Sequence, residues 1–321
     1  MFKSYFSDNH QMNIPEDDIF MKGIKIVQYP LINDPQTNQD HWNERINRDT
    51  KAPVEIDQLV IHCSFEPDIE KVLESKVAGA HYVVHKDGTV LQCVDESKRT
   101  YHAGVSSWKN VLGGADNINA HSIGIEVENP TFGSTTEYSP EQMDSLIRLC
   151  KSIIARHHIK PHNVIGHSDI APGRKADPGV LFPWRKLAEA GIGIFPKHTD
   201  QAPSSIETDP RKLLESIGYK TKTETQDELP LAMRAFKRHF MPFGIKDENP
   251  TAKQIHERKT KEPNKSSKQI LSDISLDFMI EYENNINSNK KQTLSIDSAE
   301  LKRLQVVAHA FRQSRFKAKG R

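Results

Sequence analysis

Ionisable side chains are concentrated in one short stretch of this chain, residues 166–179, which reads GHSDIAPGRKADPG. Two prolines and three glycines in that stretch rule out a long helix or a central strand. The stretch is therefore either a solvated connection or a stiff loop whose ligands and catalytic groups meet partners from elsewhere in the chain. Its candidates for chemistry are His167, Asp169, Arg174, Lys175 and Asp177.

A hydrolytic zinc site would use these residue types. Such a site takes three protein ligands and keeps one position for water, and it needs a base for that water and a cation near the developing oxyanion. The chain offers, as ligands, His62, His167 and either Asp169 or Asp177; as base, Glu126 or Glu128; and as cation, Lys175 or Arg174. Spacing alone does not select this set from 15 histidines, and no compact H-E-x-x-H signature is present.

Short β-strands must position these groups. Residues 58–64, QLVIHCS, form an apolar and β-branched run that predicts a buried strand ending at His62. Residues 163–167, NVIGH, predict another strand, which delivers His167 to the loop.

Two further segments complete the predicted sheet. Residues 121–129, HSIGIEVEN, alternate in polarity, so Glu126 and Glu128 should share one face of a strand. Residues 80–94 hold two apolar runs joined by KDG, which predicts a β-hairpin.

The clearest helix is predicted for residues 139–159. Ser139 is its expected N-cap, Pro140 suits the first helical position, and Gln142 completes a capping box. Apolar residues recur at helical spacing, and Cys150 is among them, so this cysteine belongs to the core. Strands that alternate with helices predict an α/β (or α+β) fold with a mixed central sheet flanked by helices.

Beyond residue 200 the sequence predicts short amphipathic helices, at residues 209–218, 229–240 and 297–311. Three such helices would make a small bundle, interrupted by a polar insertion at 246–292 with one ordered patch around 270–282. We therefore expect an N-terminal lead-in (1–45), a catalytic domain (46–200) and a helical domain (201–321).

Composition narrows the classes of function. A net charge of +1 disfavours a nucleic-acid partner, and no run approaches the roughly 20 apolar residues that span a bilayer. The N-terminal residues lack the apolar centre of a secretory signal. The three cysteines are widely spaced, which predicts buried thiols and no disulfide framework.

Five motifs in a fixed order resemble a known family: LVIHCS, AHYVVHKDGTVLQCV, TYHAG, HSIGIEVEN and GHSDIAPGRKADPGVLFPW. They are similar to the zinc-dependent N-acetylmuramoyl-L-alanine amidases of the type-2 amidase family, whose fold the peptidoglycan recognition proteins share. The segments LLESIGY and MRAFKRHFMP resemble the C-terminal peptidoglycan-binding bundle of the AmiD-type members. The likeness covers roughly residues 53–243 and resumes near residue 297.

The resemblance implies one zinc ion per chain and a role for each candidate. The implied zinc ligands are His62, His167 and Asp177, with Glu126 as the base and Lys175 as the cation that stabilises the oxyanion. Glu128 stays the alternative base. Asp169 then becomes a brace of the loop, which either caps a backbone turn or supports His167.

Three further residues are candidates for contacting the substrate: His102, Trp108 and Arg174. His102 matches a substrate-contacting position of the family, Trp108 could stack on a sugar, and Arg174 could bind the substrate directly. Each has a plainer alternative. His102 would be a structural turn residue, Trp108 would cover the core, and Arg174 would form a surface ion pair.

The resemblance implies hydrolysis of the amide bond between N-acetylmuramic acid and L-alanine, in peptidoglycan or muropeptides, for turnover or recycling of the cell wall. The alternative is a recognition protein that binds peptidoglycan without cutting it, and the loss of a zinc ligand marks such binders. All three ligands are present here, which favours the enzyme. The wall-binding-like bundle favours a periplasmic or secreted location in the cell envelope, and the cytoplasm is the alternative because no signal peptide is visible.

Overall fold

The computed structural model describes residues 14–15, 18–29, 31, 42–46, 52–64, 79–108, 118–129, 137–197, 199–204, 206–223, 225–241, 264 and 296–319. The predicted insertion at 246–292, with its patch around 270–282, lies outside the described residues except for residue 264. Within the described ranges, no helix has the length and apolar character needed to cross a membrane.

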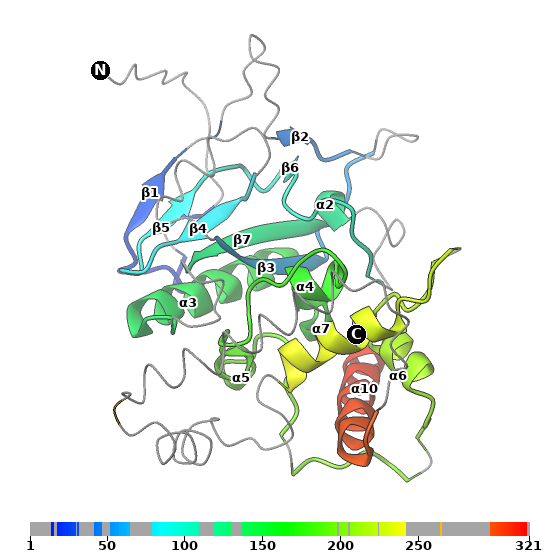
Figure 1. Ribbon diagram of the computed structural model, residues 1–321. Helices are drawn as coiled ribbons and strands as arrows, with labels where there is room; N and C mark the ends of the chain where they lie inside the picture. Colours follow the sequence, from blue (N-terminus) through cyan, green and yellow to red (C-terminus); the bar gives the residue numbers. More distant parts are fainter. Residues whose placement is uncertain are drawn as a thin grey trace.

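A six-stranded mixed sheet forms the centre of the molecule (Figure 1). Its strands, in spatial order, are β1 (Ile26–Gln28), β5 (Val90–Gln92), β4 (Tyr82–Val84), β7 (Ser122–Glu128), β3 (Gln58–Ser64) and β8 (Val164–Gly166). The strands β4, β7, β3 and β8 run parallel, whereas β5 is antiparallel to β4 and parallel to β1. The predicted mixed sheet is confirmed, and the β4–β5 pair is the predicted hairpin.

Helix α3 (Pro140–His157) covers one face of this sheet. Ser139 caps the helix as predicted, with its hydroxyl accepting a backbone hydrogen bond in the first turn. The alternation along β7 places Ile123, Ile125 and Val127 in one buried core with the apolar stripe of α3. The polar positions of β7 consequently belong to the opposite face of the sheet. Helix α5 (Trp184–Glu189) adds side chains to the same core.

The three helices predicted beyond residue 200 are α6 (Pro210–Ile217), α7 (Leu229–Phe240) and α10 (Ser298–Lys319), the last of which continues past its predicted end. Figure 1 shows them together beside the short helix α4 (His167–Ile170). The predicted C-terminal helical region is present, and it packs against the sheet. Their apolar side chains share one core with Val60 of β3, Ile165 of β8 and Ile170 of α4. An amphipathic stripe predicts that a helix is buried, but it does not encode the surface that buries it.

The sheet also begins earlier than the predicted domain boundary at residue 46. Strand β1 extends it beside β5, and β2 (Trp42–Glu44) pairs with β6 (Lys98–Thr100) in a separate two-stranded sheet. Directly after β2, the buried guanidinium of Arg45 donates to the backbone carbonyls of Glu96, Lys98, Asn119, Ala120 and Ser122, two of them in helix α2 (Ile118–His121). Strands of three residues give little sequence signal, and neither β1 nor β2 was predicted from the sequence.

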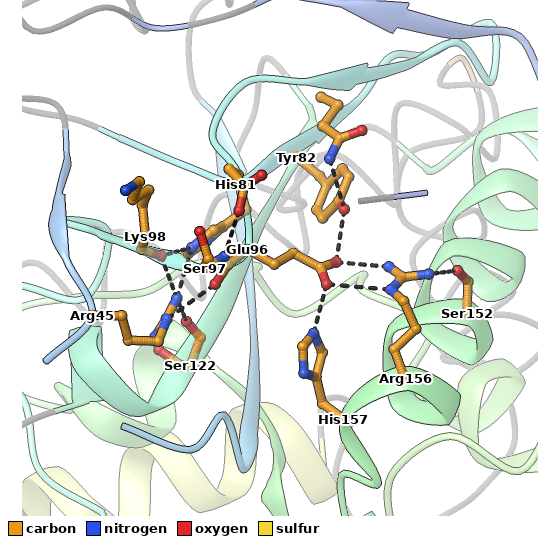
Figure 2. Close-up of polar contacts among 12 residues, drawn as sticks. Arg45, His81, Tyr82, Glu96, Ser97, Lys98, Ser122, Ser152, Arg156 and His157 are labelled. Carbon is orange, nitrogen blue, oxygen red and sulfur yellow. Dashed lines mark hydrogen bonds and ion pairs between the residues drawn. The ribbon is translucent and has the colours of Figure 1, made fainter. Parts of the chain in front are cut away.

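A second buried network joins α3 to the strands (Figure 2). The carboxylate of Glu96 lies 2.7 Å from the Tyr82 hydroxyl, 2.7 Å and 3.2 Å from nitrogens of Arg156, and 2.5 Å from His157 Nε2. Burial alone would raise the pKa of Glu96, but the hydrogen bonds from His157 and Arg156 outweigh it and lower that pKa to about 2. A buried carboxylate is therefore kept ionised by its partners.

Candidate metal centre and active site

Three neighbouring parallel strands bring the predicted ligands to one edge of the sheet. Because β7, β3 and β8 are adjacent and parallel, their carboxyl ends meet there. His62, near the end of β3, lies opposite Glu126 of β7 in the strand register. His167 follows β8 directly as the first residue of α4, and Asp177 comes from the loop that follows α4.

His62, His167 and Asp177 form a buried cluster of donor atoms. His62 Nδ1 lies 2.9 Å from His167 Nδ1, and Asp177 Oδ2 lies 3.0 Å from His167 Nδ1 and 3.4 Å from His62 Nδ1. In the part of the chain that the structure describes, this is the one group of His, Cys, Asp and Glu side chains arranged to hold a metal ion.

Hydrogen bonds behind His62 determine which of its nitrogens carries the proton. His62 Nε2 lies 2.9 Å from His102 Nδ1, and His102 Nε2 lies 3.1 Å from Ser122 Oγ. The Ser122 hydroxyl donates to the carbonyl of Ile118 at 2.6 Å. This series of bonds is satisfied when both histidines carry their proton on Nε2. His62 Nδ1 then presents a lone pair to the cluster.

His167 has the same arrangement. Its Nε2 lies 3.2 Å from the carbonyl oxygen of Ala103, which can only accept, so the proton is assigned to Nε2 and Nδ1 is left as an acceptor. The cluster thus presents two ring lone pairs and a carboxylate oxygen to one another. Acceptors at such distances repel unless a cation lies among them, so the chemistry of this donor set fits a metal ion.

The surroundings keep the donors in the forms that bind metals. Burial, followed by the neighbouring His167, lowers the pKa of His62 to about 4, so its ring is neutral near pH 7. Burial alone would raise the pKa of Asp177, but His167 and His62 hold it well below its ordinary value. A neutral imidazole and an ionised carboxylate are the states in which these side chains ligate.

Glu126 has the surroundings of a catalytic base. Its Oε2 is buried and makes no hydrogen bond to any described residue. Burial, and then the charge of Asp177, raise the pKa of Glu126 to about 8, against the opposing charge of Lys175. Lys175 is therefore close enough to act on the site electrostatically. Glu128 is engaged elsewhere, because its Oε2 accepts a hydrogen bond from the backbone N–H of Lys86 at 3.0 Å.

His102 and Trp108, which the sequence suggested as substrate contacts, both lie inside the molecule. The ring of His102 is hydrogen-bonded at both nitrogens and lies against Gly124, where an added Cβ would come within 2.5 Å of its Cγ. Trp108 is 1% exposed and packs edge-on against Tyr219, with ring centroids 5.1 Å apart. His102 thus lies behind the candidate ligand His62, and Trp108 lies in the core.

Arg174 is exposed and binds the neighbouring loop. Its Nη2 donates to the carbonyls of Ala103 at 2.6 Å and Val105 at 2.8 Å. Between them, Gly104 adopts a φ of +57°, and a Cβ there would lie 3.0 Å from the guanidinium. Arg174 therefore steadies the carbonyl that also accepts from His167.

Residues 50–180 match the sequence profile of the N-acetylmuramoyl-L-alanine amidase family known as Amidase_2. In an alignment 214 positions long, which covers 57% of this chain and 74% of the relative, the chain is 37% identical to N-acetylmuramoyl-L-alanine amidase AmiD of Escherichia coli K12. The chain belongs to this amidase family. It is also 30% identical, over 52% of its length and 97% of the relative, to 1,6-anhydro-N-acetylmuramyl-L-alanine amidase AmpD of Haemophilus influenzae.

A solved structure of E. coli AmiD, in complex with the substrate anhydro-N-acetylmuramic acid-L-Ala-D-gamma-Glu-L-Lys, matches this amidase with a TM-score of 0.50 and 36% identity. The match covers 61% of this chain and 84% of that one. The type-2 amidase fold expected from the sequence motifs is thereby confirmed.

Sequence reasoning missed how this amidase fixes the protons of its two histidines. Neither Ser122 nor the Ala103 carbonyl was a candidate, because they contact His102 and the Nε2 side of His167, away from the donor cluster. One signal was available. Gly124 lies inside a predicted strand, and a glycine at such a position marks the close approach of another group, here the ring of His102.

Proposed function

We propose that this chain is a zinc-dependent N-acetylmuramoyl-L-alanine amidase. It would hydrolyse the amide bond between the lactyl group of N-acetylmuramic acid and L-alanine, in peptidoglycan or its muropeptide fragments. The observation that carries the proposal is the buried cluster of His62, His167 and Asp177 with Glu126 beside it. Membership of the amidase family supports it, and a protein that only bound peptidoglycan would not need three intact ligands next to a buried carboxylate.

Zinc suits this donor set. A tetrahedral zinc ion with ligands at about 2.0–2.1 Å keeps its ligand atoms about 3.3 Å apart. The three donor atoms here lie 2.9, 3.0 and 3.4 Å apart. Two imidazoles and one carboxylate also leave a fourth position for water. When bound, one zinc per chain would polarise the scissile carbonyl and lower the pKa of the attacking water.

Glu126 would move the proton in this reaction. Its carboxylate accepts the proton from the attacking water and returns it to the nitrogen of the leaving L-alanine, which must be protonated to depart as an amine. The raised pKa suits the return of the proton to the leaving nitrogen, and the positive charge of a bound zinc ion would lower it towards the ionised form that first accepts the proton from water.

Lys175 would stabilise the oxygen that becomes negative when water adds to the carbonyl. Its charge already acts on both His62 and Glu126. A cation held in place before the reaction stabilises the developing charge without reorganisation. Arg174, exposed on the same loop, is our proposed substrate contact, whereas we assign His102 to hold His62 in place.

Two wider expectations remain proposals. A location in the cell envelope, and peptidoglycan binding by α6, α7 and α10, both rest on the resemblance to AmiD-type amidases. Cell fractionation tests the location. Retention of the purified chain on isolated sacculi, compared with an equal amount of an unrelated protein of similar charge, tests the binding.

The decisive experiment combines metal analysis of the purified chain with mass spectrometry of digested muropeptides. We expect about one zinc per chain and free stem peptides that begin with L-alanine, next to intact sugars. Glu126→Gln is the matched control, since it should bind zinc and release no peptide. Cleavage between the sugars would contradict the proposed bond, and binding without any cleavage would identify a recognition protein.

Chelation tests the metal separately. Removal of zinc should abolish the release of peptides, and added zinc should restore it, because the open site exchanges its ion. Full turnover by protein that is shown to be metal-free would refute the zinc assignment.

A further inference from the structure

Asp169 links the segment that carries His167 to the C-terminal helices. It lies two residues after His167 and is 1% exposed. Its Oδ2 accepts the backbone N–H of Gly166 at 2.8 Å, which is the predicted cap of a backbone turn. The same carboxylate accepts two more hydrogen bonds from beyond residue 200, one from the Tyr219 hydroxyl at 2.6 Å and one from His239 Nδ1 at 2.7 Å.

His239 is held rigidly in α7. Its ring stacks on Trp184 with centroids 3.9 Å apart and an interplanar angle of 16°. It also stacks on Phe240, again at 3.9 Å, with an angle of 8°. A ring held between two aromatic faces cannot follow a displacement of Asp169, so its Nδ1–H fixes where that carboxylate must lie.

Tyr219 is held in the same manner just after α6. Its ring packs edge-on against the buried Trp108, and Trp108 in turn lies so close to Gly218 that a Cβ there would come within 2.5 Å of the indole. The hydroxyl of Tyr219 is therefore delivered to Asp169 from a packed surface. Helices α4 and α7 are in contact, as Figure 1 shows.

We infer that the C-terminal helices set the position of the metal ligand His167, with Tyr219 and His239 as positioning residues that act through Asp169. The inference rests on the proposed function, because it assigns these contacts to a zinc site. Gly166 and Asp169 flank His167 on both sides, so an anchored carboxylate fixes the short turn from which the imidazole projects. Partners outside the ligand set typically change metal affinity by about 10–100-fold.

The test compares zinc affinity and stability in the full chain. His239→Phe keeps an aromatic ring between Trp184 and Phe240 but removes the donor to Asp169. His239→Asn restores a donor near the position of Nδ1. Tyr219→Phe removes a single hydroxyl, and this variant provides the same test if His239→Phe does not fold. Zinc dissociation constants come from competition with a chromogenic chelator, and the melting temperature of each metal-free variant comes from circular dichroism.

His162 supplies the matched control. It lies in the short helix η1 (Pro161–Asn163), is 7% exposed, and its Nδ1 lies 2.9 Å from Ser314 Oγ of α10. His162→Phe thus removes another link to the C-terminal helices, from a histidine that is itself buried, but one that does not lead to His167.

We expect His239→Phe and Tyr219→Phe to weaken zinc binding by about 10–100-fold. His239→Asn should recover most of the affinity, and His162→Phe should lose stability but stay within about threefold of the native zinc affinity. Native zinc affinity in folded His239→Phe and Tyr219→Phe would overturn the inference. Equal weakening in His162→Phe would overturn it too, since general destabilisation would then be the cause. A native chain that binds no zinc would remove the proposed function together with the inference.

Discussion

Replacement of His102 by phenylalanine tests whether the ring behind His62 controls metal affinity. Phenylalanine keeps a flat ring against Gly124 but removes the acceptor for the His62 Nε2 proton, now 2.9 Å away. In the metal-free variant, His62 can move its proton to Nδ1, where Asp177 Oδ2 at 3.4 Å or His167 Nδ1 at 2.9 Å accepts it. Metal binding must then return that proton to Nε2, where it has no partner.

The free-energy cost of moving this proton back to Nε2 sets the expected loss of zinc affinity. A buried N–H without a partner costs about 1–3 kcal/mol, which corresponds to a zinc dissociation constant about 5–150 times higher. Titration with a competing chelator measures it, and Ser122→Ala is the milder control because it removes only the acceptor at the end of the series. If folded His102→Phe keeps native zinc affinity and instead raises KM, the ring contacts substrate and our assignment of His102 is wrong.

Three further outcomes follow from the site and the buried network. Glu126→Gln should lower kcat at least about 100-fold with zinc retained, whereas Glu128→Gln should change it only a few-fold; the reverse order would mean that the base is misassigned. Lys175→Ala should lower kcat by about 10²–10³ with unchanged zinc content, and loss of zinc would contradict its role. The pKa of Glu96, about 2 in the folded chain, lies below its unfolded value, so its stabilisation is present above about pH 5 and is lost as pH falls towards 2. That contribution is roughly 3 kcal/mol of unfolding free energy. In urea unfolding, Glu96→Gln should therefore lose less stability than the native chain between about pH 5 and about pH 2, and an equal loss in both proteins would contradict the assignment.

The sequence predicts the regular elements well where one periodicity dominates. The alternation of Ile123, Ile125 and Val127 and the capped start of α3 at Ser139 are both found in the structure. These patterns are local, so neighbouring residues are enough to determine them. Residues alone left Asp169 and Asp177 as equal candidates for the third ligand, and only the family resemblance separated them.

Long-range packing decided what the sequence left open. Trp108 could have faced a sugar or the core, and the surface that buries it comes from Gly218 and Tyr219, more than a hundred residues later in the chain. In the same way, the amphipathic stripes of α6, α7 and α10 indicated burial without naming Val60 as a neighbour. Such contacts depend on how distant elements pack together, and a local sequence pattern does not determine that packing.

Arg45 lies outside the family match but makes hydrogen bonds to residues inside it. A guanidinium has five N–H groups, and here they serve the carbonyls of five residues between 96 and 122. The family match starts at residue 50, downstream of this arginine. A fragment trimmed to that match would lack the hydrogen bonds that Arg45 donates to these carbonyls, and each buried carbonyl left unsatisfied costs on the order of 1 kcal/mol or more. We therefore expect a fragment that begins at residue 50 to be less stable than one that includes Arg45.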